Sequence, residues 1–166
     1  LEAFEVARRG GLGVTIHAGE AFGLASIAEA LHLCEADRLG HGVRIVDDLE
    51  GDDLGPLATE IRDRGVVLEM CPRSNVDTGA VATLAAHPID RLLRLGFAVT
   101  VNSDNRLMSG TSPVAELRGM VETFGWGIEE LRAVNVTAAH GAFVSERRRR
   151  ELASRVVRFD PGSVNA

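Results

Sequence analysis

The stretch LGPLATEIRDRGVVLEMCPRSN (54–75) decides the fold class, because it reads as a helix, a glycine, a strand and a polar loop in succession. Residues 54–64 predict a helix that Gly65 ends. Residues 66–70 form an apolar run without alternation, which is typical of a strand buried on both faces. Residues 71–75 predict a loop. Such a unit belongs to a parallel sheet covered by helices.

The same alternation recurs on both sides of this stretch. Predicted strands occupy residues 14–17, 38–42, 66–70 and 97–101. Predicted helices occupy residues 2–9, 26–34, 54–64, 88–95, 113–124, 128–139 and 145–157. An Asp-rich loop follows the second strand, and a loop at 102–105 follows the fourth. Four strand–helix units with short connections predict an α/β fold with a parallel sheet.

Length leaves two architectures open. The 166 residues suffice for one doubly wound α/β domain but fall short of the roughly 250 of a complete (β/α)8 barrel. The chain begins at Leu1, without Met, inside a predicted helix. We therefore expect a segment of a longer protein.

Composition excludes several classes of partner. A net charge of −6 argues against a protein that binds nucleic acid through bulk charge. No apolar run approaches the roughly 18–20 residues of a membrane span. Cys34 and Cys71 make no disulfide framework, so we expect a cytoplasmic protein. The arginine run 147–150 lies between Glu146 and Glu151 and predicts a solvated helix face.

Reactive side chains follow each predicted strand. His17 and Glu20 follow the first, His41 the second, Cys71 the third and Asp104 the fourth. In parallel α/β folds the ligand site lies at the carboxyl ends of the strands. One histidine at a strand end is usually structural, but this succession predicts a catalytic site.

The residue types indicate hydrolysis. His17 and Asp104 offer a nitrogen and an oxygen donor that zinc accepts. A carboxyl such as Glu20 in a partly apolar site has a raised pKa and can donate a proton near neutral pH. His41 could take or orient a proton on a metal-bound water. The set suits attack on an electrophilic carbon with protonation of a neighbouring nitrogen.

At these residues the sequence resembles the adenosine deaminase family of metal-dependent amidohydrolases. The helical tail at 128–152 also resembles the family's C-terminal segment. The matching motifs, in the family's order, are TIHAGE (15–20), DRLGHGVRI (37–45), LEMCPRSNVDTGAV (68–81), HPIDRLL (87–93) and VTVNSDNRLMSGTS (99–112).

The resemblance implies a fold and a reaction. The fold is the C-terminal half of a (β/α)8 barrel, strands five to eight with their helices plus C-terminal helices, so residues 1–166 form a single partial domain. Zn²⁺ would be held by His17 and Asp104. Glu20 would protonate purine N1, and His41 would orient or deprotonate the attacking water. The reaction is deamination of adenosine or 2′-deoxyadenosine to inosine or 2′-deoxyinosine plus ammonia.

The metal ligands depart from the family pattern. The family's other ligands are a His-x-His pair on the first barrel strand, and the histidines here are well separated, at 17, 32, 41, 87 and 140. Two protein ligands are fewer than the three or four of zinc sites. We therefore expect the isolated segment to bind metal poorly and to be inactive.

The purine contact also departs from the pattern. The family commonly has Asp-Asp where this chain has Asp104-Asn105. The resemblance places the second residue against purine N7, an acceptor. An amide NH2 donates a hydrogen bond at any pH, so Asn105 remains a predicted substrate contact.

Two alternatives stay open. The substrate could be adenine or another 6-aminopurine. Alternatively, the chain is no enzyme but an inactive half-barrel that acts only by association with another copy or with the missing N-terminal half. Its sheet would expose two edges, which favours such association. Ser74, Asn75 and His87 are predicted to shape loops, and Cys71 to be a buried thiol.

Overall fold

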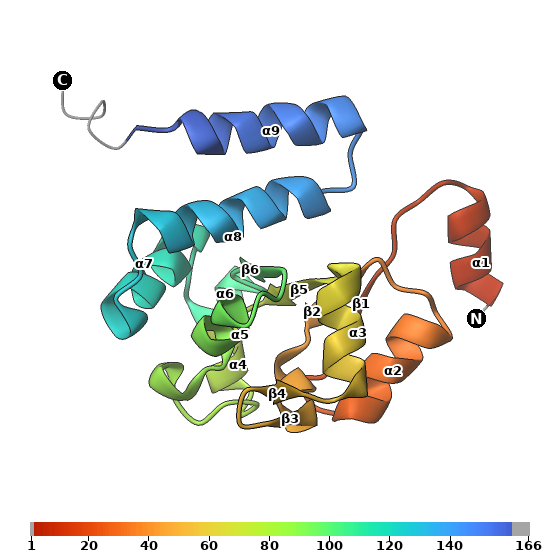
Figure 1. Ribbon diagram of the computed structural model, residues 1–166, viewed down its shortest axis with the longest axis horizontal. Helices are drawn as coiled ribbons and strands as arrows, with labels where there is room; N and C mark the ends of the chain where they lie inside the picture. The colour runs from red at the N-terminus through yellow and green to blue at the C-terminus, as the bar shows by residue number, and fades with distance from the viewer. Residues whose placement is uncertain (1, 161–166) are drawn as a thin grey trace.

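The computed structural model describes residues 2–160. A parallel sheet in the order β1-β2-β5-β6 lies at its centre (Figure 1). Its strands are β1 (Thr15–Ala18), β2 (Arg38–His41), β5 (Val67–Met70) and β6 (Val99–Val101). Each strand pairs with its predecessor in this sheet, whereas a doubly wound sheet reverses its order at a switch point. The parallel α/β fold is confirmed, and its winding is that of a barrel.

One face of the sheet carries the apolar core. Right-handed crossovers between consecutive parallel strands place the connecting helices on the same face. Ile27, Leu31 and Ile61 from two of these helices share one apolar cluster with Leu39 and Leu68 of the strands. The connecting helices are α2 (Leu24–His32), α3 (Pro56–Arg64), α4 (Pro72–Asp77) and α5 (Ile89–Arg94).

The opposite face of the sheet is polar. Arg38 and Glu69 form an ion pair of 3.1 Å there, and Thr15 donates a hydrogen bond to Glu69. Thr15 and His17 of β1 are exposed. The expectation of strands buried on both faces is therefore wrong for β1, because its polar side chains point to the uncovered side.

Loops predicted from polar residues contain additional structure. The predicted loop at 71–75 is wrong, because Pro72 starts α4 at the helical position that proline favours. The loop at 102–105 leads into α6 (Arg106–Ser109). The further elements between residues 43 and 86 are η1 (Val43–Asp48), β3 (Leu49–Glu50), β4 (Asp53–Leu54) and η2 (Leu84–Ala86).

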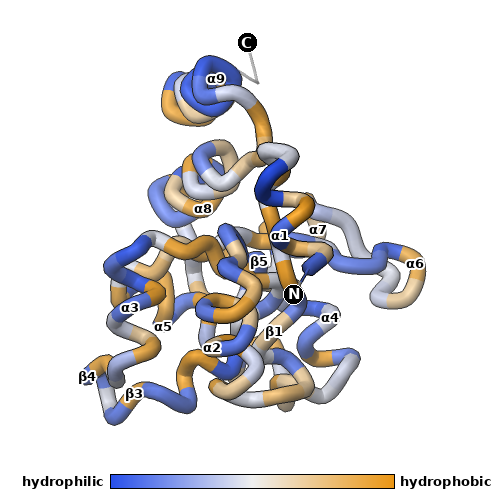
Figure 2. Tube along the Cα trace, turned by 90° about the vertical axis from the view of Figure 1, so that its right-hand side faces the viewer, coloured by the Kyte–Doolittle hydropathy of each residue, from blue (hydrophilic) through white to orange (hydrophobic). Residues whose placement is uncertain are grey.

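The remaining helices precede β1 or follow β6 in the chain. They are α1 (Glu2–Arg9), α7 (Pro113–Phe124), α8 (Ile128–Gly141) and α9 (Glu146–Arg158). Arg38, which starts β2, donates a hydrogen bond of 2.8 Å to the carbonyl of Gly141, so the end of α8 lies at the amino ends of the strands. α9 lies along α8 as an outer layer (Figures 1 and 2).

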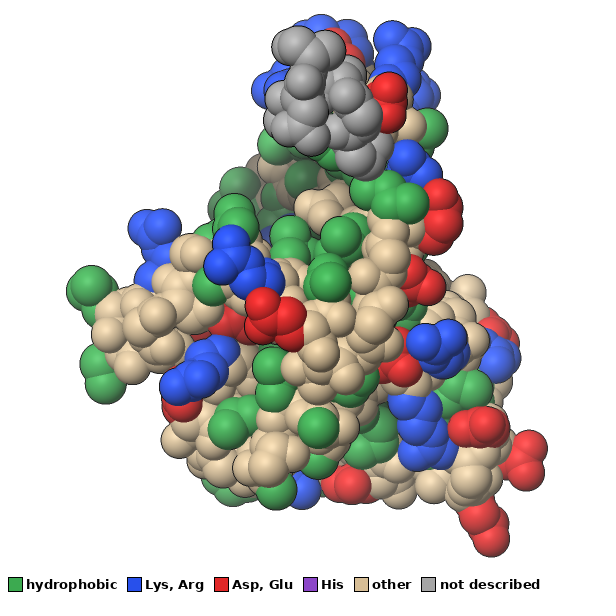
Figure 3. Space-filling model, turned by 90° about the vertical axis from the view of Figure 1, so that its left-hand side faces the viewer, with side chains coloured by type: hydrophobic (Ala, Val, Ile, Leu, Met, Phe, Trp, Pro, Cys, Tyr) green, Lys and Arg blue, Asp and Glu red, His purple; other side chains and the backbone are tan. Residues whose placement is uncertain are grey.

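The arginine run lies on α9, as predicted for a solvated face. Arg147 and Arg148 pair with Glu151, and Arg149 and Arg150 pair with Glu146. Basic and acidic side chains accordingly gather together at the top of the molecule in Figure 3. Between residues 2 and 160, no helix combines the length and apolar character needed to cross a membrane.

Candidate functional site

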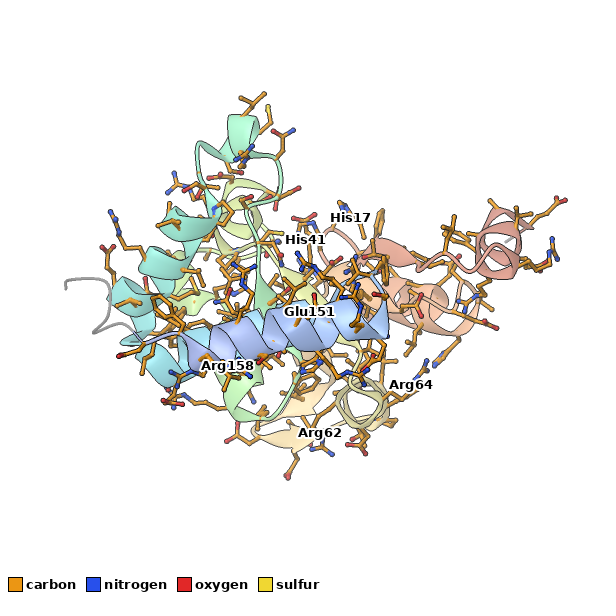
Figure 4. All side chains as sticks on the ribbon, turned by 90° about the horizontal axis from the view of Figure 1, so that it is seen from above. His17, His41, Arg62, Arg64, Glu151 and Arg158 are labelled. Carbon is orange, nitrogen blue, oxygen red and sulfur yellow. The ribbon has the colours of Figure 1, made fainter. Side chains whose placement is uncertain are left out.

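Glycines shape the carboxyl ends of β1 and β2. Gly40 is the register partner of His17, and a Cβ at position 40 would lie 2.5 Å from Cδ2 of that histidine. Gly40 thus leaves the room in which His17 lies across β2. His41 and Gly42 both adopt positive φ angles, 65° and 68°, which turn the chain out of the strand. The rings of His17 and His41 meet edge to face, with centroids 5.0 Å apart (Figure 4).

Glu20 and His41 face each other, as the order of the strands predicts. Glu20 Oε2 lies 3.4 Å from His41 Nε2. Glu20 Oε1 accepts hydrogen bonds of 3.0 Å from Asn75 Nδ2 and from Thr78 Oγ. The carboxylate is therefore held by two donors from α4 and its C-terminal end, with its second oxygen turned to the imidazole.

His41 is almost fully buried, with 2% of its surface exposed. Burial lowers the pKa of His41 below its ordinary value, opposed by the negative charge of Glu20 and reinforced by His17. In a neutral imidazole one nitrogen is protonated and the other can accept a hydrogen bond.

The two predicted metal ligands lie on the open side of the site. His17 and Asp104 are exposed. Asp104 Oδ2 accepts a hydrogen bond of 2.7 Å from Ser74 Oγ. Within residues 2–160, no group of three or more His, Cys, Asp or Glu side chains is arranged to hold a metal ion. A nitrogen and a carboxylate oxygen suit zinc chemically, but these residues alone do not fit a complete zinc site.

Asn105 has a structural task beside the predicted one. Its Oδ1 accepts hydrogen bonds from the backbone N–H groups of Leu107 and Met108, at 3.1 and 3.2 Å, and thereby caps α6. The cap fixes the amide with Oδ1 toward the helix. The donor Nδ2, which a purine acceptor requires, is the other atom of that amide.

Cys71 is a buried free thiol, as predicted. Burial raises the pKa of Cys71 to about 12, and the nearby charge of Asp104 adds to the shift. A thiol with this pKa stays protonated at neutral pH, and the thiolate is the nucleophilic form. Cys71 therefore contributes packing at the strand end.

Sequence reasoning missed two residues that hold the site together. Asn75 and His87, predicted to shape loops, are buried with exposed fractions of 0% and 3%. Asn75 Nδ2 lies 3.0 Å from His41 Nδ1, and Asn75 Oδ1 lies 3.1 Å from His87 Nε2. The one signal in the sequence is His-Pro at a helix start, where a ring nitrogen can accept from the first backbone N–H groups.

Because burial lowers the pKa of His87 to about 4 from 6.5, this residue makes the fold acid-sensitive. Between pH 6.5 and pH 4, His87 is protonated in the unfolded chain but remains neutral in the folded chain. The free energy of unfolding therefore falls as the pH drops from 6.5 toward 4. Between pH 7 and pH 5, we expect His87 to remove roughly 2 kcal/mol of unfolding free energy. Urea unfolding of the wild type and His87→Gln at both pH values measures this, and equal losses in the two proteins would contradict it.

The comparisons with known proteins agree with this arrangement. The adenosine deaminase family model matches residues 1–159. An adenosine deaminase of Mycolicibacterium vanbaalenii is 53% identical over 163 residues, which are 95% of this chain and 45% of that protein. The chain thus spans about half the length of the curated relatives it matches.

Solved structures give the same picture. The adenine deaminase of Arthrobacter aurescens superposes with a TM-score of 0.86 at 28% identity, covering 99% of this chain and 47% of that one. An amidohydrolase of Burkholderia ambifaria with bound Zn superposes at 0.81 and 24% identity, covering 94% and 42%. The predicted half-barrel is confirmed, since this chain, with its parallel four-stranded sheet, superposes on about half of the deaminase chain and of the amidohydrolase chain. The chain belongs to the adenosine deaminase family.

Proposed function

We propose that this chain supplies the acid–base half of a purine deaminase acting on adenosine and 2′-deoxyadenosine. The observation that carries the proposal is the Glu20–His41 pair at the carboxyl ends of the adjacent strands β1 and β2. Glu20 Oε2 and His41 Nε2 lie 3.4 Å apart. The name of the 53% identical relative supports the choice of adenosine.

The proposed reaction exchanges an amine for a hydroxyl. A water oxygen bonds to C6 of the purine while Glu20 gives its proton to N1. One proton of the water ends on N6 and the other on the carboxylate left at Glu20. The C6–N6 bond breaks, the amine leaves as ammonia, and the ring becomes that of inosine. His41 orients the attacking water or takes one of its protons, and Nδ2 of Asn105 donates a hydrogen bond to N7.

Zinc enters this proposal only with additional ligands. Within residues 2–160 no complete group of metal ligands occurs. His17 and Asp104 would supply two donors, and the others would come from the missing half. Bound zinc lowers the pKa of a coordinated water toward 7. The structural neighbour with bound Zn supports the choice of metal.

Adenine is the second candidate substrate, because the Arthrobacter aurescens neighbour at 28% identity is an adenine deaminase. The two substrates differ in the ribose, which leaves the purine contacts unchanged. Product formation from adenine and from adenosine, compared in the same active preparation, separates the two.

For its partner, we propose the half-barrel that corresponds to the rest of the relatives. The chain covers 45% of the Mycolicibacterium vanbaalenii protein. β1 is the first strand in the sheet order β1-β2-β5-β6 and so lies at one edge of the sheet, where a further strand can pair. A second copy of the chain would satisfy the edge but would bring no His-x-His ligands.

The decisive experiment restores the missing half. We expect the 166-residue chain alone to form no inosine and to hold well under one zinc ion. Co-expression with the N-terminal half of the Mycolicibacterium vanbaalenii relative should give a complex with about one zinc ion and inosine formation. Turnover by the chain alone would refute the need for the other half, and an inactive zinc-loaded complex would refute the deaminase proposal.

A further inference from the structure

A buried line of hydrogen bonds runs from the start of α5 to the candidate site. It begins at the backbone N–H of Ile89, which donates to His87 Nδ1 at 3.2 Å. Position 88 is a proline without an N–H, so Ile89 provides the first donor of the helix. A backbone N–H can only donate. His87 Nδ1 therefore carries no proton, and in the neutral ring the proton lies on Nε2.

The proton on His87 fixes the orientation of Asn75. His87 Nε2 lies 3.1 Å from Asn75 Oδ1, so it donates to that oxygen. The reversed amide would bring two donors face to face in a fully buried place and leave both without an acceptor, which is unfavourable. Asn75 therefore points its NH2 group away from His87 and toward the candidate site.

The NH2 group of Asn75 donates one hydrogen bond to Glu20 and one to His41. Nδ2 lies 3.0 Å from Glu20 Oε1 and 3.0 Å from His41 Nδ1. Since this nitrogen donates, His41 Nδ1 must accept. A ring that accepts at Nδ1 carries its one proton on Nε2, the atom that lies 3.4 Å from Glu20 Oε2.

We propose that His87 and Asn75 are positioning residues that set the Nε2–H tautomer of His41 and hold Glu20 beside it. The direction of each hydrogen bond is fixed by the one before it, beginning with the backbone N–H of Ile89, which can only donate. The arrangement joins α5, α4 and the ends of β1 and β2, four segments separated in sequence, through two side chains.

The tautomer bears on the proposed reaction, and this part rests on the proposed function. With Nδ1 occupied by Asn75 and Nε2 protonated, His41 offers a hydrogen-bond donor to the site and no vacant acceptor. It would then orient the attacking water, and the role of removing a proton from that water would fall to another group. The two roles that the sequence leaves open for His41 are separated in this way.

Nitrogen NMR tests the tautomer directly and needs no enzyme activity. Long-range ¹H–¹⁵N correlation spectra of the ¹⁵N-labelled 166-residue chain distinguish a protonated from a bare ring nitrogen, with each histidine assigned by its substitution. At neutral pH, we expect both His41 and His87 as Nε2–H tautomers. His41 found as Nδ1–H or doubly protonated would overturn the proposal, whether or not a restored enzyme is active.

Asn75→Asp changes the direction of one bond. A carboxylate still accepts from His87 but can only accept from His41, so we expect the proton of His41 to move to Nδ1. One hydrogen bond of this kind shifts the ratio of tautomers roughly tenfold. His87 should keep its Nε2–H form. The matched control is Asn135→Asp, the same change on α8, where Asn135 Nδ2 donates a hydrogen bond of 2.8 Å to the Leu131 carbonyl. This control should leave both rings unchanged.

A pair of His87 variants decides the question if Asn75→Asp does not fold. Gln in place of His87 keeps an N–H donor for Asn75 Oδ1, so His41 should remain Nε2–H. Leu in place of His87 removes the donor and frees the amide, so His41 should lose its single tautomer. The same His41 tautomer in both His87 variants, or an unchanged one in folded Asn75→Asp, would refute the relay.

Discussion

A Glu20→Gln substitution is expected to lower inosine formation by about 10²–10⁴-fold in the complex restored with the N-terminal half, which is the usual contribution of a positioned acid or base. Glutamine keeps the size of the side chain and an oxygen that can accept from Asn75 and Thr78, the two donors at Glu20 Oε1. It has no acidic proton to deliver to N1. Initial rates at saturating adenosine measure the loss.

The matched control for this variant is Glu60→Gln. Glu60 lies on α3 and binds His32 and Arg64 at the surface, away from the strand ends. The control should retain the wild-type rate. If Glu20→Gln keeps more than about a tenth of that rate, a general-acid role for Glu20 is excluded.

Truncation of Leu68 should have the largest effect on stability. Leu68 is fully buried in β5, between β2 and β6. Its Cδ2 comes within 2.8 Å of the place where a Cβ at Gly42 would stand, so it packs directly beneath the turn that follows His41. Leu68→Ala leaves a cavity there and is expected to cost about 2–5 kcal/mol of unfolding free energy.

Urea unfolding at neutral pH measures this cost. Leu107→Ala is the matched control, because Leu107 on α6 is 94% exposed and its truncation should stay within about 0.5 kcal/mol of the wild type. Equal stabilities of the Leu68 and Leu107 variants would show that the apolar cluster around β5 is not the core of the fold.

The regular elements of this fold are predictable from local signals. The predicted bounds 2–9 and 113–124 coincide with α1 and α7, and the predicted helix at 54–64 differs from α3 only at its start. α4 escaped prediction because its six residues include Pro72, Ser74 and Asn75, which individually favour turns. Its helical state depends on the packing of the strand end.

The candidate site was predictable to the extent that it lies at strand ends. His17, Glu20 and His41 meet because parallel strands bring their carboxyl ends to one edge. Asn75 and His87 reach the same place from α4 and from the start of α5, and nothing in their spacing states that they would touch. Long-range placement of this kind arises from tertiary packing, which a single sequence does not encode in its periodicity.

The cap on α6 limits which residues can be inherited at position 105. The Asn105 side chain, which would contact the purine, also caps the start of α6 by accepting hydrogen bonds from the backbone N–H groups of Leu107 and Met108. Drift at this position is therefore confined to short side chains with an acceptor oxygen, among which Asp and Asn are nearly equivalent as caps. The exchange between the family's common aspartate and this chain's asparagine is a step that evolution can take without losing the helix, whereas a larger or apolar residue would remove the cap and, with it, the proposed purine contact.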